Sequence, residues 1–153
     1  MDDRSGRKPV WVYADGVCDL FHVGHIRFFE QARALGDRLV VGLHSDDVVA
    51  TYKPRPILGF ADRLEVVRAC RLVDRVIETP VPLHVTIADL DSYGADFACH
   101  ADDMSKEQMD YWYGELVASG RIKVVRYTEG ISSRDIVARV AERLKAGTLR
   151  IKL

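Results

Sequence analysis

Two histidines three residues apart, His22 and His25, follow an apolar segment and a short turn near the start of the chain. If the residues after the turn form a helix, the two imidazoles lie one turn apart on one face. They then stand at the helix end where backbone N–H groups are unpaired and the dipole is positive. Two imidazoles there can donate hydrogen bonds to phosphoryl oxygens, and Gly24 lets a ligand approach the backbone closely. The stretch 13–25 therefore predicts a phosphate-binding site that needs no protein nucleophile when the substrate brings its own.

Two other interpretations of the histidine pair are open. One histidine could cap the helix while the other is solvated. The pair could also bind a metal, but the sequence offers no third His or Cys at the spacing of a structural zinc site. Cys18, in the turn, is more typical of a small packed residue. We therefore expect no metal site formed by protein side chains.

Strands and helices alternate in the predicted structure of the whole chain. The predicted strands are 10–14, 38–44, 75–78, 96–100 and 122–127. The predicted helices are 23–35, 61–70, 85–93, 106–118, a short helix capped by Ser45, and a last one capped by Ser132 or Ser133 that runs to Lys145. This alternation indicates an α/β fold with a five-stranded parallel sheet and helices on both faces. We expect one domain over 9–146, a disordered N-terminus over 1–8 and a C-terminal tail over 147–153.

Polar clusters follow the predicted strands directly, at 15–25, 100–103 and 126–134. A fourth cluster, 53–55, lies in the segment 51–59, which cannot be helical because of Pro54 and Pro56. That segment carries two cations, Lys53 and Arg55. In open parallel sheets ligands bind at the carboxyl ends of the strands, where the strand order reverses. We therefore expect the four clusters to form one site.

Composition limits the classes of function. The chain has 153 residues, of which 48% are hydrophobic and 29% charged, with a net charge of −1, as expected of an ordinary globular domain. This charge balance argues against a broad surface for nucleic acid or membrane. The three cysteines, Cys18, Cys70 and Cys99, are too few and too far apart for a disulfide framework and favour reduced thiols. With a polar N-terminus and no long apolar run, we expect a cytoplasmic protein.

Two segments carry a resemblance to a known family. GVCDLFHVGH, residues 16–25, resembles the signature G-x-F-D-x-x-H-x-G-H of the cytidylyltransferases, and TEGISS, residues 128–133, resembles their second signature, R-T-E-G-I-S-T-[ST]. Between them, RLEVVRACRLVDRVI and DFACHADD resemble segments of the phosphoethanolamine branch. The resemblance covers about residues 9–140. Because two signatures occur in the right order, it is more specific than H-x-G-H alone, which adenylyltransferases share.

The resemblance implies a Rossmann-like fold and a homodimer. It also implies transfer of CMP from CTP to a small phosphorylated alcohol, with Mg²⁺ bound with the CTP and release of pyrophosphate. His22 and His25 would stabilise the transition state, and Lys53 would bind phosphates. Asp19 is expected to order its loop. Nucleotide contacts are implied for the other residues at matching positions, which are Gly16, Val17, Cys18, Asp19, Gly24, Arg63, His100, Asp102, Asp103, Thr128, Gly130, Ile131, Ser132 and Ser133.

The chain departs from the family pattern at several positions. Cys18 replaces a phenylalanine and Ala101 a glycine. Tyr127 replaces the arginine that precedes the threonine of the second signature. Arg126 is one place earlier, and on a strand a shift of one residue turns the side chain to the opposite face. Arg134, where the family has Thr or Ser, could supply the missing charge at the nucleotide instead, so the choice between Arg126 and Arg134 stays open.

The acceptor is less well defined by the sequence. Asp19, Lys53, Leu83 and Tyr113 are expected to contact it, with Tyr113 matching a family tyrosine. Leu83 stands where choline and ethanolamine enzymes carry an aromatic residue that suits an ammonium group. Phosphoethanolamine therefore competes with a hydroxyalkyl phosphonate such as 2-hydroxyethylphosphonate. The alternatives are a degenerate domain that binds a nucleotide as a sensor, and an adenylyltransferase of the same fold.

Overall fold

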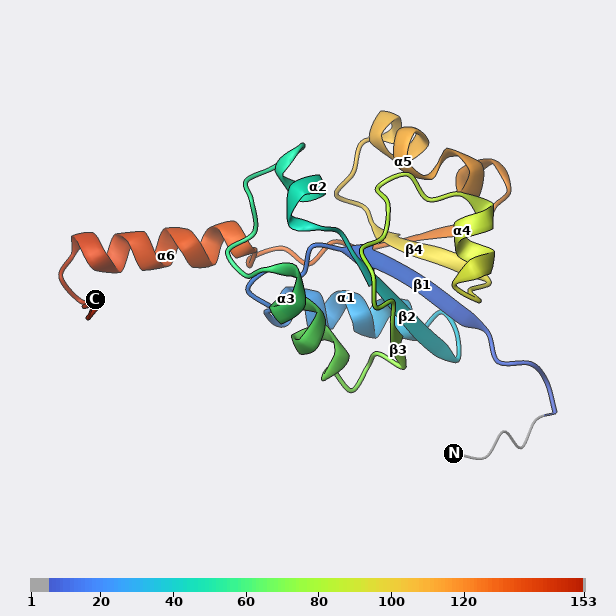
Figure 1. Ribbon diagram of the computed structural model, residues 1–153, viewed down its shortest axis with the longest axis horizontal. Helices are drawn as coiled ribbons and strands as arrows, with labels where there is room; N and C mark the ends of the chain where they lie inside the picture. The colour runs from blue at the N-terminus through green and yellow to red at the C-terminus, as the bar shows by residue number, and fades with distance from the viewer. Residues whose placement is uncertain (1–5, 153) are drawn as a thin grey trace.

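Five parallel strands form the centre of the computed structural model, which describes residues 6–152. In spatial order they are β3, β2, β1, β4 and β5 (Figure 1). Their bounds are β1 Trp11–Gly16, β2 Arg38–Leu43, β3 Arg75–Val76, β4 Phe97–Ala101 and β5 Ile122–Val125. The five-stranded α/β sheet predicted from the sequence is therefore confirmed. Residues 1–5 of the expected disordered segment lie outside the described range, whereas Arg7 forms an ion pair with Asp37.

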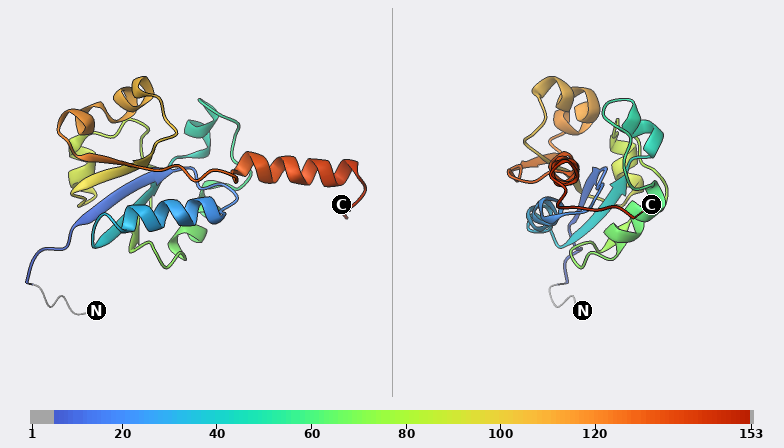
Figure 2. Two further views of the ribbon diagram at one scale, coloured as in Figure 1. Left: turned by 180° about the vertical axis from the view of Figure 1, so that it is seen from behind. Right: turned by 90° about the vertical axis from the view of Figure 1, so that its left-hand side faces the viewer.

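The central strand β1 is apolar because both of its faces are covered. Val12 and Ala14 point into one buried cluster, together with Phe29 of α1 (Val23–Arg33) and Val67 of α3 (Phe60–Arg68). Tyr13 points into the other. That second cluster also contains residues of α4 (Ile87–Ser92) and α5 (Lys106–Ala118). Figure 2 shows the two pairs of helices on opposite sides of the sheet.

Two further helices lie at the carboxyl ends of the strands. The short α2, Asp46–Ala50, begins after Ser45, whose side chain accepts a hydrogen bond from the Val48 amide, as predicted. The last helix, α6, runs from Ser133 to Lys145 and is capped by Ser132. It projects away from the sheet (Figure 1), and none of its side chains is buried. In the part of the chain that the structure describes, no helix is long and apolar enough to cross a membrane.

The predicted ends of β5 and α4 differ from those in the structure for local reasons. The last strand was expected to reach residue 127 but ends at Val125, because side chains take over the backbone bonds there. Gln31 of α1 both donates to the Arg126 carbonyl and accepts from the Arg126 amide. The Tyr127 amide donates to Asp102. Helix α4 begins at Ile87 and not at 85, since Thr86 and Asp89 form a capping box.

The strand order reverses between β1 and β4. From β1 the chain crosses to β2 on one side, and from β4 it crosses to β5 on the other. A crevice therefore opens at the carboxyl ends of these two neighbours, the usual ligand position in such sheets. The polar clusters identified in the sequence converge here.

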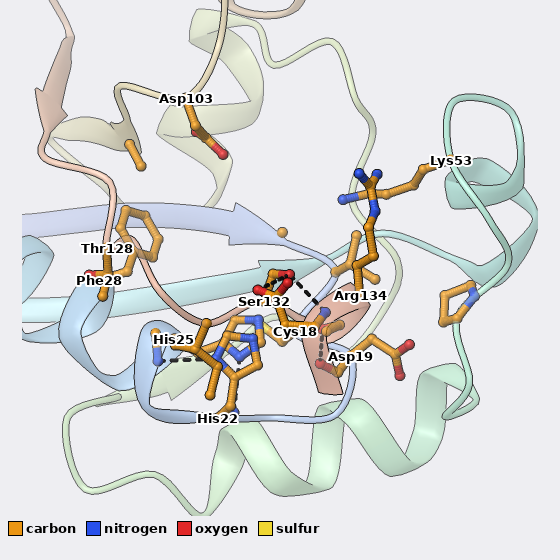
Figure 3. Close-up of a pocket in the computed structure, with 18 of the residues that line it drawn as sticks. Cys18, Asp19, His22, His25, Phe28, Lys53, Asp103, Thr128, Ser132 and Arg134 are labelled. Atoms are coloured by element: carbon orange, nitrogen blue, oxygen red, sulfur yellow. Dashed lines mark hydrogen bonds between the residues drawn. The ribbon is translucent and has the colours of Figure 1, made fainter. Parts of the chain in front are cut away.

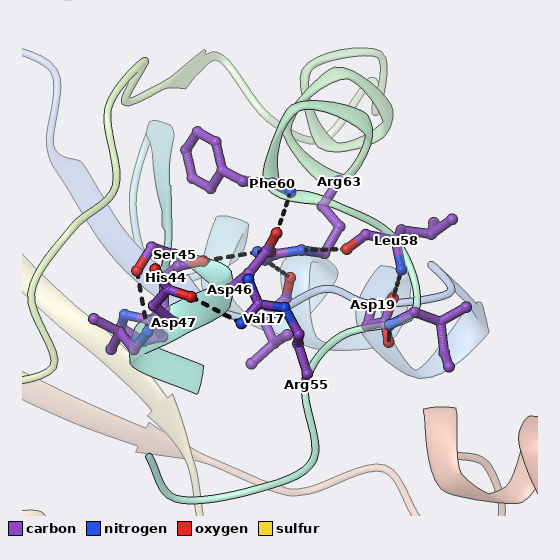
Figure 4. Close-up of polar contacts among 12 residues, drawn as sticks. Val17, Asp19, His44, Ser45, Asp46, Asp47, Arg55, Leu58, Phe60 and Arg63 are labelled. Carbon is purple, nitrogen blue, oxygen red and sulfur yellow. Dashed lines mark hydrogen bonds and ion pairs between the residues drawn. The ribbon is translucent and has the colours of Figure 1, made fainter. Parts of the chain in front are cut away.

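A buried arginine, Arg63 of α3, joins the segments that border the crevice (Figure 4). Its side chain is 0% exposed. Its Nε donates to the Leu58 carbonyl at 3.1 Å and its Nη1 to the Val17 carbonyl at 2.6 Å. Its Nη2 donates to the His44 carbonyl at 2.9 Å and to Asp46 at 2.6 Å. The expected nucleotide contact of Arg63 is therefore wrong for this structure, because the guanidinium is enclosed and occupied by protein acceptors.

Replacing Arg63 by methionine should cost about 3 kcal/mol or more of unfolding free energy, because the Val17, His44 and Leu58 carbonyls would lose their donor. Urea denaturation at pH 7 measures this. The matched control is Arg68→Met on the same helix, where the exposed arginine pairs with Glu65 and Glu78 at the surface. That change should cost less than about 1 kcal/mol. Equal losses for the two variants would contradict the structural role of Arg63.

Candidate active site

One cavity of about 750 Å³ occupies the crevice. Its walls come from the turn after β1, the segment 51–59, the carboxyl end of β4 and the segment from β5 into α6. It brings together most of the residues that the sequence indicated. These are Gly16, Val17, Cys18, Asp19, His22, Gly24, His25, Lys53, His100, Asp103, Thr128, Ile131, Ser132, Ser133 and Arg134.

Four expected site residues besides Arg63 do not line this cavity. Tyr113 is 2% exposed, and its hydroxyl donates to Asp15, so it supports the wall from behind. Asp102 accepts from the Tyr127 amide and fixes the end of β5. Gly130 has a φ of 89°, which the turn before α6 requires of a glycine. Leu83 is half-buried outside the cavity, so its expected place beside the acceptor is not met.

His22 and His25 form a reciprocal capping box at the start of α1 (Figure 3). Nδ1 of His22 accepts from the Gly24 amide at 3.0 Å, and Nδ1 of His25 accepts from the His22 amide at 3.1 Å. A ring nitrogen that accepts an N–H carries no proton, so each neutral ring holds its proton on Nε2. The capping interpretation is therefore confirmed for His22. It is compatible with a ligand role, because both Nε2–H groups stay available as donors.

Burial keeps both rings neutral. It is the main cause that lowers the pKa of His25 to about 4, with the neighbouring His22 and Lys53 acting in the same direction and Asp19 against it. Burial also lowers the pKa of His22, against the influence of Asp135. The ring centroids are 3.9 Å apart, a separation at which two imidazolium charges would repel. At neutral pH the pair therefore acts as two uncharged N–H donors.

Gly24 is required by the His22 ring as well as by any ligand. A Cβ on Gly24 would lie 2.8 Å from Cε1 and 2.9 Å from Nδ1 of His22. Such contacts are shorter than real Cβ atoms make, so the imidazole would have to leave its capping position. The signature glycine thus fixes the orientation of the histidine two positions before it.

Asp19 joins the turn to the segment 51–59. Its Oδ2 accepts from the Ile57 amide at 2.8 Å and its Oδ1 from the Leu58 amide at 2.9 Å. Its carbonyl accepts from the Ser133 hydroxyl at 2.6 Å, which ties the first turn of α6 to the same place. The expectation that Asp19 orders this loop is confirmed. The adjacent Cys18 is no nucleophile, since burial raises the pKa of its thiol to about 12.

Asp15 is the functional candidate that the sequence reasoning missed. It lines the cavity at the end of β1 and is 8% exposed. Its two oxygens accept from the hydroxyls of Tyr113, at 2.5 Å, and Tyr13, at 3.1 Å. No Lys or Arg among the described residues forms an ion pair with it. A buried carboxylate held only by neutral donors favours a cationic ligand group. Its position at the carboxyl end of the first predicted strand was the sequence feature that could have indicated a role in the site.

Replacing Gly24 by alanine should lower the unfolding free energy by about 1 kcal/mol or more, the usual value of a lost N-cap. The matched control is Gly114→Ala in α5, where an added Cβ would meet nothing within 4 Å. That substitution should not lower the unfolding free energy, because the added Cβ meets no clash there. Urea denaturation of both variants provides the comparison, and a Gly24→Ala protein at least as stable as wild type would refute the proposed clash.

The pKa of His25 predicts a pH dependence. In the unfolded chain its pKa is about 6.5, and in the folded protein about 4. Between these values the unfolded chain binds more protons, so stability should fall as pH drops from about 6.5 to 4. His25→Gln keeps an acceptor at this capping position but cannot titrate, so its stability should fall less over that range. NMR titration of the His25 ring gives the pKa directly, and a midpoint near 6.5 would contradict the burial effect.

Comparison with known proteins agrees with this geometry. Residues 13–139 match the family model "Cytidylyltransferase-like". The chain is 39% identical over 142 residues to ethanolamine-phosphate cytidylyltransferase of Dictyostelium discoideum, covering 92% of this chain and 39% of that protein. It is 36% identical over 156 residues to choline-phosphate cytidylyltransferase 2 of Arabidopsis thaliana, covering 97% of this chain and 50% of that one. The chain thus spans half or less of the length of these relatives.

A solved structure supports the fold alone. The lipopolysaccharide core biosynthesis protein of Thermoplasma volcanium superposes with a TM-score of 0.65 at 23% identity, covering 81% of this chain and all of that one. The family model, which matches most of the chain, establishes the relationship. The chain belongs to the cytidylyltransferase-like family.

Proposed function

We propose that this protein transfers CMP from CTP to phosphoethanolamine and releases pyrophosphate. The relatives named ethanolamine-phosphate cytidylyltransferase support the reaction type. The observation that carries the choice of acceptor is Asp15, a buried carboxylate on the cavity wall that lacks a cationic partner among the described residues. An acceptor with a phosphate at one end and an ammonium at the other meets both the histidine donors and this carboxylate.

The reaction follows from the groups in the cavity. A phosphate oxygen of the acceptor attacks the α-phosphorus of CTP in line, and the bond from that phosphorus to the pyrophosphate oxygen breaks. The electron pair of the broken bond leaves with pyrophosphate. The attacking phosphate oxygen is already anionic, so no proton has to be removed from the nucleophile. Nε2–H groups of His22 and His25 donate to phosphoryl oxygens as charge develops on them. Cys18 forms no intermediate, because its thiol stays protonated.

Mg²⁺ is part of the proposal and would arrive bound to CTP. No group of three or more His, Cys, Asp or Glu able to hold a metal occurs among residues 6–152. This fits Mg²⁺, which keeps waters and binds substrate phosphates with one or two carboxylates. Asp103 is the carboxylate of the β4 loop that lines the cavity and could contribute. The ion would neutralise charge on the outer phosphates.

The acceptor assignment follows from comparing charges. A hydroxyalkyl phosphonate has no cation, so it would leave Asp15 buried without a counter-charge. A primary ammonium can donate N–H to a carboxylate whose oxygens already accept two hydroxyls, whereas the quaternary ammonium of phosphocholine has no N–H. Leu83 lies outside the cavity, so its lack of an aromatic ring does not favour a phosphonate acceptor. The homodimer and the cytoplasmic location stay predictions.

Pyrophosphate release from CTP should be fastest with phosphoethanolamine in a panel with phosphocholine, 2-hydroxyethylphosphonate and glycerol phosphate. Asp15→Asn should raise the KM for phosphoethanolamine roughly 10- to 100-fold, since a hydrogen bond to a charged group contributes about 1.5–3 kcal/mol. The Kd of CTP should not change. The control is Asp62→Asn, an exposed position on α3 away from the cavity.

Three outcomes would redirect the proposal. An unchanged KM in Asp15→Asn, or a preference for the phosphonate, would refute the acceptor assignment. Tight CTP binding without turnover on any acceptor would favour a nucleotide sensor. Faster turnover with ATP than with CTP would make the protein an adenylyltransferase.

A further inference from the structure

Two cations from different parts of the chain line the cavity without an anionic partner. Lys53 stands on the segment 51–59, and Arg134 on the first turn of α6. Over the described residues neither forms an ion pair. The Lys53 ammonium lies 5.2 Å from the centroid of the Tyr52 ring. By contrast, the neighbouring Arg55 is paired with Asp47.

The two cations lie close enough to affect each other. In Figure 3 the side chains of Lys53 and Arg134 extend toward the same part of the cavity. Burial lowers the pKa of Lys53, and Arg134 lowers it further, whereas Asp103 and Asp19 act in the opposite direction. Two like charges held together at a cavity wall are unfavourable unless an anion joins them. A ligand with several negative charges would remove the repulsion.

Asp19 connects the two elements that carry these cations. Segment 51–59 is fixed at its end, where the Ile57 and Leu58 amides donate to Asp19 and the Leu58 carbonyl accepts from Arg63. Helix α6 has no buried side chain, and the Ser133 hydroxyl on the Asp19 carbonyl anchors its first turn. Asp19 therefore accepts hydrogen bonds from both elements. A polyphosphate bound between Lys53 and Arg134 would thus add a second connection between two elements that meet at one residue.

We propose that Arg134 binds the outer phosphates of the nucleotide together with Lys53, and that this bridge docks α6 against the segment 51–59. The proposal rests on CTP as the nucleotide of the proposed function. It assigns to Arg134 the charge that Tyr127 does not provide. Arg126 also lines the cavity, but Arg134 is the arginine that acts on Lys53. An arginine suits this role because its planar guanidinium can donate to two phosphate oxygens at once.

Calorimetric titration of the full chain with CTP, CMP and inorganic pyrophosphate tests this assignment. Arg134→Gln should weaken CTP and pyrophosphate binding about tenfold or more, the loss expected for one charge-assisted contact. CMP has no outer phosphates, so its Kd should stay within about twofold of wild type. Arg139→Gln is the matched control, five residues further along α6 and outside the cavity, and should bind all three ligands as wild type does.

Hydrogen exchange provides a second readout that does not depend on turnover. Pyrophosphate should slow amide exchange in residues 131–138 of wild type and Arg139→Gln, but not of Arg134→Gln. Thermal melts of the unliganded variants check that folding is intact. The same result for Arg134→Gln and wild type, an equal loss for CMP and CTP, or a loss confined to Arg126→Gln would overturn the assignment.

The experiments distinguish failure of the proposed CMP transfer from failure of the proposed Arg134 bridge. If wild type binds CTP much more tightly than CMP and Arg134→Gln abolishes the difference, the bridge is supported even when no acceptor is turned over. If wild type makes CDP-ethanolamine while Arg134→Gln binds CTP normally, the function is supported and the bridge is refuted.

Discussion

The buried guanidinium of Arg63 is the interaction on which the rest of the site depends. A charge removed from water must find partners for its hydrogen-bond donors, or the fold loses several kcal/mol. Arg63 finds them on three different segments, through Val17, His44 and Leu58, and on the carboxylate of Asp46. The turn after β1, the end of β2 and the end of the segment 51–59 therefore converge on α3. The cavity walls are set by this requirement before any ligand is bound.

Periodicity and capping residues predicted the elements well, because those signals are local. Ser45 and Ser132 cap helices where expected, and helix 106–118 has the predicted bounds. The end of β5 could not be predicted in this way. It is set by Gln31 and Asp102, which lie 95 and 25 residues away in sequence from the backbone groups they bind. Long-range side-chain bonds to the backbone leave no pattern in a single sequence.

Motif membership located the site but did not separate residues that face the ligand from those that support them. Arg63 and Tyr113 belong to matching segments, yet both side chains are buried behind the wall. Asp15 faces the cavity although the sequence reasoning gave it no role. The difference depends on which way a side chain leaves its strand or helix, and on what covers it. Both depend on the tertiary structure, and residue type alone does not determine them.

The capping box on α1 has a consequence for sequence variation. The hydrogen bonds that start the helix also fix which ring nitrogen of each histidine is free, so folding and the proposed chemistry impose the same demand on positions 22, 24 and 25. Stability and activity are often traded against each other at a reactive centre, but here one set of contacts serves both. Selection for either would preserve the motif. Between residues 22 and 25 only Val23, which is 42% exposed to solvent, is under neither demand.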